Sequence, residues 1–116
     1  IEQLKSKLIK HNFTVKVTNE LSNLSAMVES SLILMLTEAV TNILKHSNGD
    51  KVIIQFEQSD NALSLSISDN GTVDEVSFGN GLTGITERCQ QLNGSVEVEH
   101  KQGMAIKINL PGKLDD

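Results

Sequence analysis

The sequence predicts an α+β fold: a two-layer α/β sandwich in which a mostly antiparallel sheet packs against about three helices. The chain has 116 residues, which is enough for one domain and too few for two ordinary ones. Several short segments alternate apolar and polar residues, as half-buried strands do, and others repeat apolar residues every three or four positions, as helices do. Consecutive pairs of strands among fewer helices favour a sheet that is covered on one face.

Each expected element has its own sequence signal. The longest helical pattern covers residues 26–46, where residues such as Leu32 and Met35 recur at helical spacing after Ser25, a possible N-cap. A second helix is expected over residues 82–92, because an Asn-Gly pair follows it as a common helix stop. The other expected elements are a helix over residues 1–11 and strands over residues 13–17, 51–57, 62–68, 95–100 and 104–110.

The composition excludes several classes of function. The formal net charge is −5 and the chain has neither Trp nor Tyr, so we expect no nucleic-acid partner. The single cysteine, Cys89, excludes an internal disulfide, and its place in an expected helix favours an inert, half-buried thiol over a reactive one. The longest apolar run, residues 32–36, is far shorter than the roughly 20 residues that span a bilayer, and no signal peptide is visible.

The long helix carries a polar stripe. Glu38, Asn42, Lys45 and His46 lie four, three and one residues apart, so a helix places them along one side. A solvated helix face is one interpretation. The other is a site for a divalent ion and the phosphates that it bridges, since Mg²⁺ takes oxygen ligands and keeps several waters.

Two glycine-containing motifs follow. Asp69-Asn70-Gly71 comes directly after an expected strand and reads either as a plain turn or as a carboxylate that accepts a hydrogen bond from the adenine amine. Residues 79–84, Gly-Asn-Gly-Leu-Thr-Gly, are expected to open the next helix, where free N–H groups would face an anion. No Gly-Lys-Ser/Thr follows, so this is not a Walker loop, and the string alone is weak evidence.

The order and spacing of these motifs resemble the ATPase domain shared by DNA gyrase B, Hsp90, sensor histidine kinases and MutL, the GHKL superfamily with the Bergerat fold. Residues 38–47 resemble its N box, residues 69–71 its first glycine box and residues 79–84 its second, and the match covers roughly residues 26–111. The Lys-His-Ser end of the N box and the sequence Gly-Leu-Thr-Gly-Ile-Thr-Glu-Arg that follows Asn80 resemble the compact sensor kinases of the DesK/NarX type.

The resemblance implies a role for each motif residue. Asn42 would coordinate Mg²⁺, Glu38 would hold a metal-bound water or assist proton removal, and Lys45 would neutralise phosphate charge beside His46. Asp69 would receive the adenine amine. The remaining implied nucleotide-binding residues are Gly71 against the adenine ring and Gly79, Gly81, Leu82, Thr83 and Gly84 around the phosphates.

The resemblance also implies a function: ATP-dependent phosphorylation of a histidine on a helical domain that is absent from this chain. The chain opens on Ile1 without a Met, so we expect a single catalytic domain over residues 1–116, detached from dimerisation, phosphoacceptor and sensor domains. The three histidines of the chain, His11, His46 and His100, are poor phosphoacceptors by their sequence context. Expected partners are ATP, that helical domain in a dimeric parent and a cognate response regulator. The domain would be cytoplasmic and its parent anchored in the cell membrane.

Two alternatives share the fold, namely an anti-sigma-factor-type serine kinase and a non-catalytic nucleotide-binding module. The second is favoured if the adenine site is damaged. The family commonly has a Thr hydroxyl behind the adenine-binding carboxylate, where this chain has Met104, and Ser68 is a possible substitute. Finally, residues 70–80 show no periodicity and few apolar residues, so we expect them to be mobile without nucleotide and ordered with it.

Overall fold

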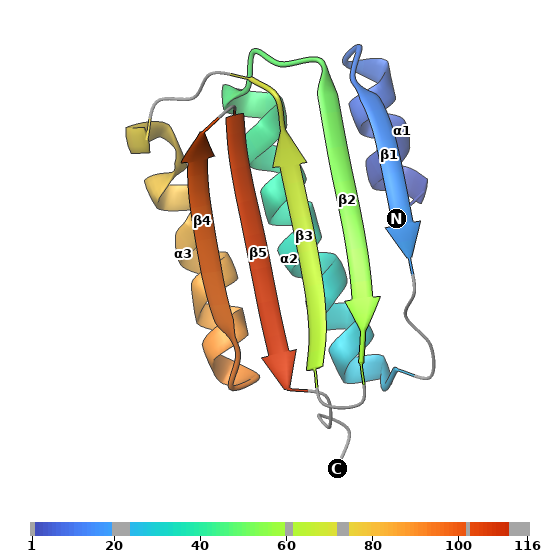
Figure 1. The fold of residues 1–116 in the computed structure, drawn as a ribbon, viewed down its shortest axis with the longest axis vertical. Coiled ribbons are helices and arrows are strands. Elements are labelled where there is room, and N and C mark those ends of the chain that lie inside the picture. The colour runs from blue at the N-terminus through green and yellow to red at the C-terminus, as the bar shows by residue number, and fades with distance from the viewer. Residues whose placement is uncertain (1, 20–23, 60–61, 72–74, 102, 112–116) are drawn as a thin grey trace.

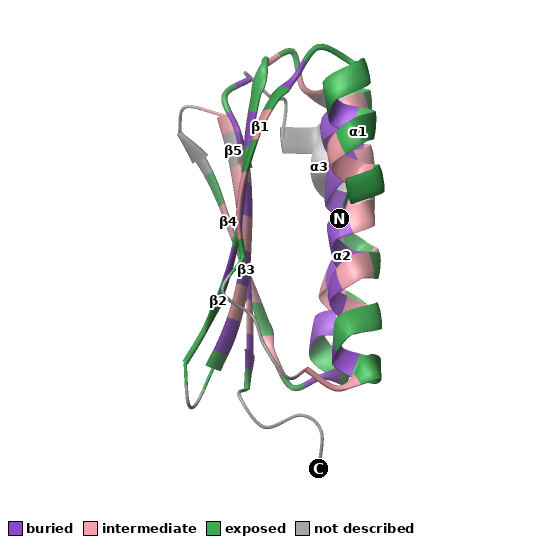
Figure 2. Cartoon of the chain, turned by 90° about the vertical axis from the view of Figure 1, so that its right-hand side faces the viewer, coloured by how far each residue is buried: buried purple, intermediate pink, exposed green. Residues whose placement is uncertain are grey.

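Two layers, a five-stranded sheet and a set of three helices on one of its faces, make up the computed structural model of the chain (Figures 1 and 2). The structure describes residues 2–19, 24–59, 62–71, 75–101 and 103–111. In chain order the elements are α1 (Glu2–Lys10), β1 (Thr14–Asn19), α2 (Ala26–His46), β2 (Lys51–Gln58), β3 (Ala62–Asp69), α3 (Glu75–Gln91), β4 (Ser95–Lys101) and β5 (Gly103–Pro111). The predicted fold class is confirmed.

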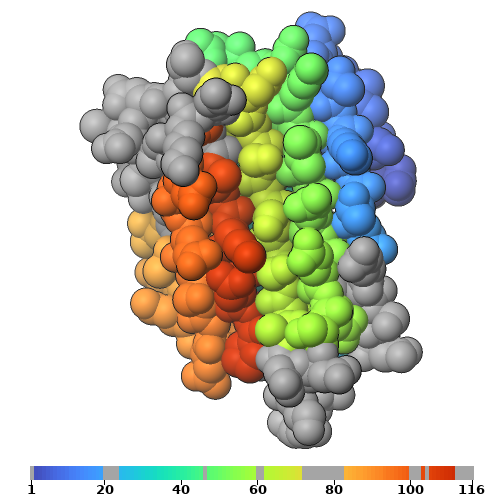
Figure 3. Space-filling model, in the orientation of Figure 1, coloured from blue at the N-terminus to red at the C-terminus, as the bar shows by residue number. Residues whose placement is uncertain are grey.

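The sheet has the strand order β1-β2-β3-β5-β4, and only the β1–β2 pair is parallel. The parallel pair is joined through α2, which supplies the long crossover that parallel strands need. No helix of the described part of the chain covers the opposite face of the five-stranded sheet, which forms an open surface (Figures 2 and 3). Helices α1, α2 and α3 therefore all lie on the same side of the sheet.

The core lies between the two layers and is mostly aliphatic. Alternate residues of β2 and β3 point toward the helices and are buried, and the facing side of α2 is buried along most of its length. Full burial of a side chain such as Leu65 or Leu36 stabilises the fold by about 1.5–3 kcal/mol. Asp69 continues the inward row of β3 and is also buried, so a carboxylate occupies a position that the strand otherwise gives to Leu and Ile.

The helix boundaries follow from local hydrogen bonding. Ser25 caps α2, since its hydroxyl accepts from the Val28 N–H at 3.2 Å, and this confirms the predicted N-cap. At the end of α3, Asn93 takes a left-handed φ of 61° while the Gly94 N–H donates to the Cys89 carbonyl at 2.9 Å. This is the Schellman arrangement expected of an Asn-Gly stop.

The start of α3 differs from the sequence prediction. The helix begins at Glu75 and not at Leu82. The prediction that the glycine motif of residues 79–84 forms the start of this helix was therefore wrong. The interval 72–74 of the expected mobile segment lies outside the described residues, and residues 75–80 are helical. Helical hydrogen bonds satisfy the backbone N–H groups beyond the first turn, although each glycine costs roughly 1 kcal/mol relative to Ala in a helix.

Helix α2 is, by length and composition, apolar enough to cross a membrane, and it is the one such helix among the described residues. Core helices of folded domains pass the same test. Here the apolar side of α2 packs against the sheet, with Met35, Leu36 and Val40 fully buried, so the structure explains its hydropathy as that of a core helix.

Candidate functional site

Three buried polar atoms lack a hydrogen-bond partner in the described part of the chain. They are Oε2 of Glu38, Nδ2 of Asn42 and Oδ2 of Asp69. Such atoms are rare in folded proteins, because each unsatisfied buried group costs about 1–3 kcal/mol. All three belong to residues that the sequence singled out for nucleotide binding. The fold thus leaves unpaired the groups that a polar ligand would pair.

The carboxylate of Asp69 has two oxygens in different environments. Oδ1 accepts from the Gly71 N–H at 2.8 Å and from the Ser47 hydroxyl at 3.1 Å. Oδ2 is buried without a partner in the described structure, and the residue as a whole is only 6% exposed. One oxygen therefore fixes the side chain while the other remains an available acceptor.

The loop after α2 lies against the turn after β3. Asn70 joins them, because its Oδ1 accepts from the N–H groups of Asp50 and Lys51, both at 2.9 Å, and its Nδ2 donates to the Asp50 carboxylate at 2.8 Å. Gly71 permits the close approach: a Cβ there would come within 2.5 Å of the Ser47 Oγ. From the sequence, Asn70 was expected only to form a turn, because the contact that joins the two loops is made with a residue 20 positions away along the chain.

Glu38 lies at the contact between α2 and α3. A Cβ on Gly84 would come 2.5 Å from its Oε2 and 2.7 Å from its Oε1, so the carboxylate occupies the space that this glycine leaves open. The Arg88 Nε lies 3.9 Å from the Glu38 Oε1. Because both side chains are more than a third exposed, this ion pair contributes little to stability, but it places a cation next to the carboxylate. Arg88 was not among the predicted site residues.

The rest of the predicted stripe on α2 divides by depth. Asn42 is 6% exposed and its amide makes no hydrogen bond to a described residue, so the interpretation of a solvated helix face is wrong for Asn42. Lys45, near the end of the helix, is exposed. The side chain of His46 lies outside the described residues. Hence α2 presents a buried amide next to a region of exposed charge.

The second glycine motif is incorporated into α3. Gly79 and Gly81 lie in the helix, as does Leu82, and the side chain of Leu82 is outside the described residues. Thr83 is exposed and Gly84 partly buried. In this arrangement the backbone N–H groups of the motif belong to the helix interior, so they do not form the open anion cradle that was predicted for a helix start. The Glu38–Gly84 contact links this motif to the α2 stripe.

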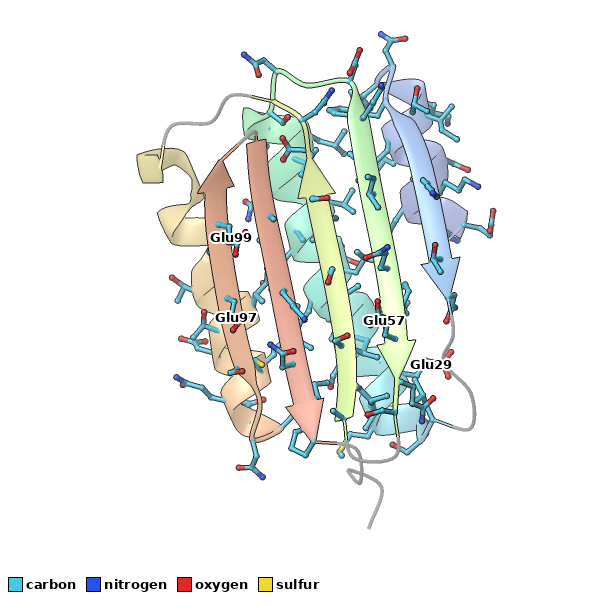
Figure 4. All side chains as sticks on the ribbon, viewed as in Figure 1. Glu29, Glu57, Glu97 and Glu99 are labelled. Carbon is cyan, nitrogen blue, oxygen red and sulfur yellow. The ribbon has the colours of Figure 1, made fainter. Side chains whose placement is uncertain are left out.

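Ser68 is not the hydroxyl that supports Asp69. Successive side chains of a strand point to opposite faces, so Ser68 projects from the uncovered face of the sheet while Asp69 points toward the helices. That outer face is polar, and the carboxylates of Glu57, Glu97 and Glu99 lie along its strands (Figure 4). The hydroxyl that reaches Asp69 comes from Ser47, at the C-cap of α2, and the suggestion of Ser68 was wrong.

Known proteins identify this arrangement. Residues 27–114, well over half of the chain, match the family described as histidine kinase-, DNA gyrase B- and HSP90-like ATPase. The chain belongs to this ATPase family. Its curated relatives are bacterial sensor kinases, so it is an ATP-binding domain of the sensor histidine kinase type, as the motif order predicted.

The curated relatives are much longer than this chain. It is 34% identical over 93 residues to sensor histidine kinase DesK of Bacillus subtilis, a match that covers 77% of the chain and 25% of DesK. It is 30% identical over 110 residues to sensor protein VraS of Staphylococcus aureus, covering 88% of the chain and 32% of VraS. The chain thus spans between a quarter and a third of the length of these two relatives.

Solved structures share the fold. The ATP-binding domain of PrrB from Mycobacterium tuberculosis superposes with a TM-score of 0.74 at 21% identity, covering 96% of this chain and 90% of that one. The blue-light activated histidine kinase of Erythrobacter litoralis EL346 gives a TM-score of 0.81 at 20% identity, covering 96% of this chain and 40% of that one. The ATPase domain described here therefore has the two-layer architecture of histidine kinase nucleotide-binding domains.

The residues present fit the two groups that the family implies. The acceptor Oδ2 of Asp69 suits an exocyclic amine, and a half-turn of the unpaired Asn42 amide exchanges its oxygen and nitrogen without breaking a hydrogen bond to a described residue. The described residues contain no group of three or more His, Cys, Asp or Glu arranged to hold a metal ion. Proteins usually hold Mg²⁺ through one or two side chains together with substrate phosphates.

Proposed function

We propose that this ATPase domain binds Mg²⁺·ATP and delivers the γ-phosphate to a histidine on a separate helical domain of a two-component sensor kinase. The observation that carries the proposal is the coincidence of the three unpaired buried atoms with the expected metal, water and adenine ligands, namely Asn42, Glu38 and Asp69. An ATP-binding fold alone does not require unpaired atoms at these particular positions.

Adenine recognition is assigned to Asp69. Its Oδ2 accepts from the amine at position 6 of adenine, whereas the carbonyl at the same position of guanine would face it with a second acceptor. Gly71 holds this carboxylate in place, since its N–H donates to Oδ1 of Asp69 at 2.8 Å. The site is therefore expected to select ATP over GTP.

Phosphate and metal binding are assigned to α2 and the start of α3. Asn42 supplies an oxygen ligand to Mg²⁺, Lys45 neutralises phosphate charge with His46 beside it, and Glu38 holds a metal-bound water or removes a proton. When bound, Mg²⁺ would neutralise the negative charge that develops during transfer. The second glycine motif, residues 79–84, contacts the phosphates through backbone N–H groups, and this requires the first turns of α3 to open.

The phosphoacceptor is assigned to another domain. Phosphoryl transfer depends mainly on positioning and charge neutralisation, so a nucleotide domain without its acceptor binds ATP and turns over very little of it. We do not assign this role to His11, because Asn12 follows it where the acceptor histidine of the family is followed by Asp or Glu. We assign the acceptor to a dimeric helical domain of a membrane-anchored parent, place the ATPase domain in the cytoplasm, and expect a response regulator to receive the phosphoryl group.

Two measurements test the proposal in sequence. Calorimetry on the 116-residue chain gives the affinities for ATP and GTP with and without Mg²⁺, and we expect Mg²⁺-dependent, ATP-selective binding. The full-length parent is then incubated with γ-labelled ATP, and acid-labile, base-stable label is expected because phosphohistidine has that stability. Acid-stable label on a serine would instead support an anti-sigma-factor-type kinase, and binding without any labelled protein would support a non-catalytic nucleotide module.

A further inference from the structure

The Ser47 hydroxyl links the end of α2 to the end of β3. Ser47 is the C-cap of α2, where its N–H donates to the Ile43 carbonyl at 2.9 Å. Its Oγ accepts from the Gly49 N–H at 3.0 Å and lies 3.1 Å from Oδ1 of Asp69. The residue is thus held through both its backbone and its side chain, at the end of the helix that carries the metal-site residues.

The direction of the Ser47 proton follows from its neighbours. A hydroxyl has a single proton to donate, and Gly49 already uses one acceptor lone pair of this oxygen. An ionised carboxylate can only accept, so the proton of Ser47 points to Oδ1 of Asp69. The Gly71 N–H donates to the same oxygen, so two donors fix Oδ1 and none of the described groups donates to Oδ2.

This network fixes the orientation of the Asp69 carboxylate. With one oxygen held by two donors, a rotation about χ2 that moves the other oxygen from its position would weaken both hydrogen bonds at a buried site. Without the Ser47 proton, a single N–H would remain. The position of Oδ2, the assigned adenine acceptor, therefore depends on a side chain that does not itself face the ligand.

We propose that Ser47 is a positioning residue for purine recognition, acting through Asp69 to select a ring with an amine at position 6. The proposal rests on the assignment of Asp69 as the adenine acceptor. It extends that assignment by separating two roles along one helix: Asn42 and Glu38 serve the metal and phosphates, and Ser47 serves base selectivity. Ser47, at the end of α2, would thereby supply the hydroxyl that the family commonly has at the position of Met104.

The test compares ATP with inosine triphosphate, which carries a carbonyl in place of the amine at position 6. Affinities of the 116-residue chain for both nucleotides are measured by calorimetry in Mg²⁺ for the wild type, Ser47→Ala, Ser47→Thr and Ser68→Ala. We expect Ser47→Ala to reduce the ATP-to-inosine-triphosphate preference by about three- to tenfold, mainly through weaker ATP binding. Ser47→Thr keeps the hydroxyl and should keep the preference.

Ser68→Ala is the matched control, since it also removes one serine hydroxyl next to Asp69 but on the uncovered face of the sheet. It should leave the preference unchanged. A Ser47→Ala variant that weakens both nucleotides equally, or retains the wild-type preference, would overturn the proposal. If Ser47→Ala does not fold at the assay temperature, Ser47→Cys, with a similar size and a weak donor, is judged by the same criterion.

The outcome also distinguishes this proposal from the underlying assignment. A wild-type chain that binds ATP and inosine triphosphate equally contradicts the role of Asp69, and the role of Ser47 falls with it. A wild-type chain that discriminates, together with a Ser47→Ala variant that discriminates equally well, contradicts the role of Ser47 alone.

Discussion

The carboxylate of Glu38 lies over Gly84, in the space where any other residue would place its Cβ. This contact joins the α2 stripe to the second glycine motif in α3, two parts of the chain that sequence alone relates only through family resemblance. The neighbouring atoms are the far end of a flexible side chain, so a Cβ at Gly84 would displace Glu38 and leave both helices in place.

Gly84→Ala is therefore expected to separate stability from catalysis. Replacing a helical glycine by alanine favours the helix by up to about 1 kcal/mol, so the free energy of unfolding in urea should stay level or rise. The displaced carboxylate should lower phosphoryl transfer by the full-length parent at least tenfold, within the range that a general base or water-holding group supplies. Gln90→Ala, on the exposed side of α3, is the control and should change neither quantity. A large loss of stability in Gly84→Ala would show that Glu38 cannot move aside.

Asp69→Asn should abolish adenine selectivity while the fold persists. The Asn oxygen can accept from Ser47 and Gly71 as Oδ1 of Asp69 does, and its NH₂ group then replaces the free acceptor Oδ2 with a donor. Loss of a charge-assisted hydrogen bond costs about 1.5–3 kcal/mol, so ATP affinity measured by calorimetry should fall at least tenfold. Unchanged ATP affinity in this variant would remove Asp69 from the adenine site.

Asn42→Ala should remove the Mg²⁺ dependence of ATP binding with little effect on folding. Asn42 is buried, but its amide makes no hydrogen bond to a described residue, so its removal leaves no new unsatisfied group. We expect a change of at most about 1 kcal/mol in the free energy of unfolding. Ile43→Ala, at the neighbouring buried position, is the comparison and should cost about 2–5 kcal/mol. A similar loss for Asn42→Ala would mean that the amide is structural.

Elements were predicted well from the sequence where the apolar repeat was long and was not interrupted by glycines. The bounds of α2, residues 26–46, agree with the prediction at both ends, because the apolar repeat is continuous and Ser25 caps it. The start of α3 was missed because glycine strings are usual in loops, whereas here the helix runs through residues 79–84 and lies against Glu38 of α2 at Gly84. The low helix propensity of glycine is therefore a weak guide to where a helix begins.

The motif residues of the candidate site could be proposed from the sequence, but the residues that support them could not. Glu38, Asn42 and Asp69 were proposed from the order and spacing of the motifs, and each has one buried side-chain atom without a partner in the described structure. Ser47 and Arg88 were missed as supports, because each acts through a contact between segments that are distant in sequence. Ser68 was preferred for its adjacency to Asp69, although strand alternation points neighbouring side chains to opposite faces.

Cys89 should react slowly with thiol reagents in the folded protein. It is fully buried on α3, and burial raises the pKa of its thiol above the usual value because the thiolate is disfavoured away from water. The folded chain thus keeps this proton to higher pH than the unfolded chain, so the contribution of Cys89 to stability is complete below the ordinary thiol pKa and declines as pH rises above it. Labelling with a maleimide should be slow at pH 8 and fast in denaturant. Rapid labelling of the folded chain would contradict the burial.

Hydrogen exchange along α3 tests whether the second glycine motif is poised to open. The motif places Gly79, Gly81 and Gly84 within the first ten residues of the helix, each at a cost of about 1 kcal/mol relative to Ala. The later part of α3 is anchored by Ile85 and Cys89, both fully buried. Without nucleotide, amides of residues 79–84 should therefore exchange faster than those of residues 85–91, since glycines lower the free energy of local opening, whereas opening at Ile85 and Cys89 exposes buried side chains.

Mg²⁺·ATP should change the exchange of residues 79–84 and leave residues 85–91 nearly unaltered, because phosphate oxygens offer acceptors to N–H groups that the opened turns release. The control is Asp69→Asn, in which weaker binding should shift the nucleotide concentration needed for the change but not its location. Uniform slow exchange across α3 in the nucleotide-free chain, unaffected by saturating ATP, would show a rigid helix. In that case the glycine motif would not bind phosphate through its backbone.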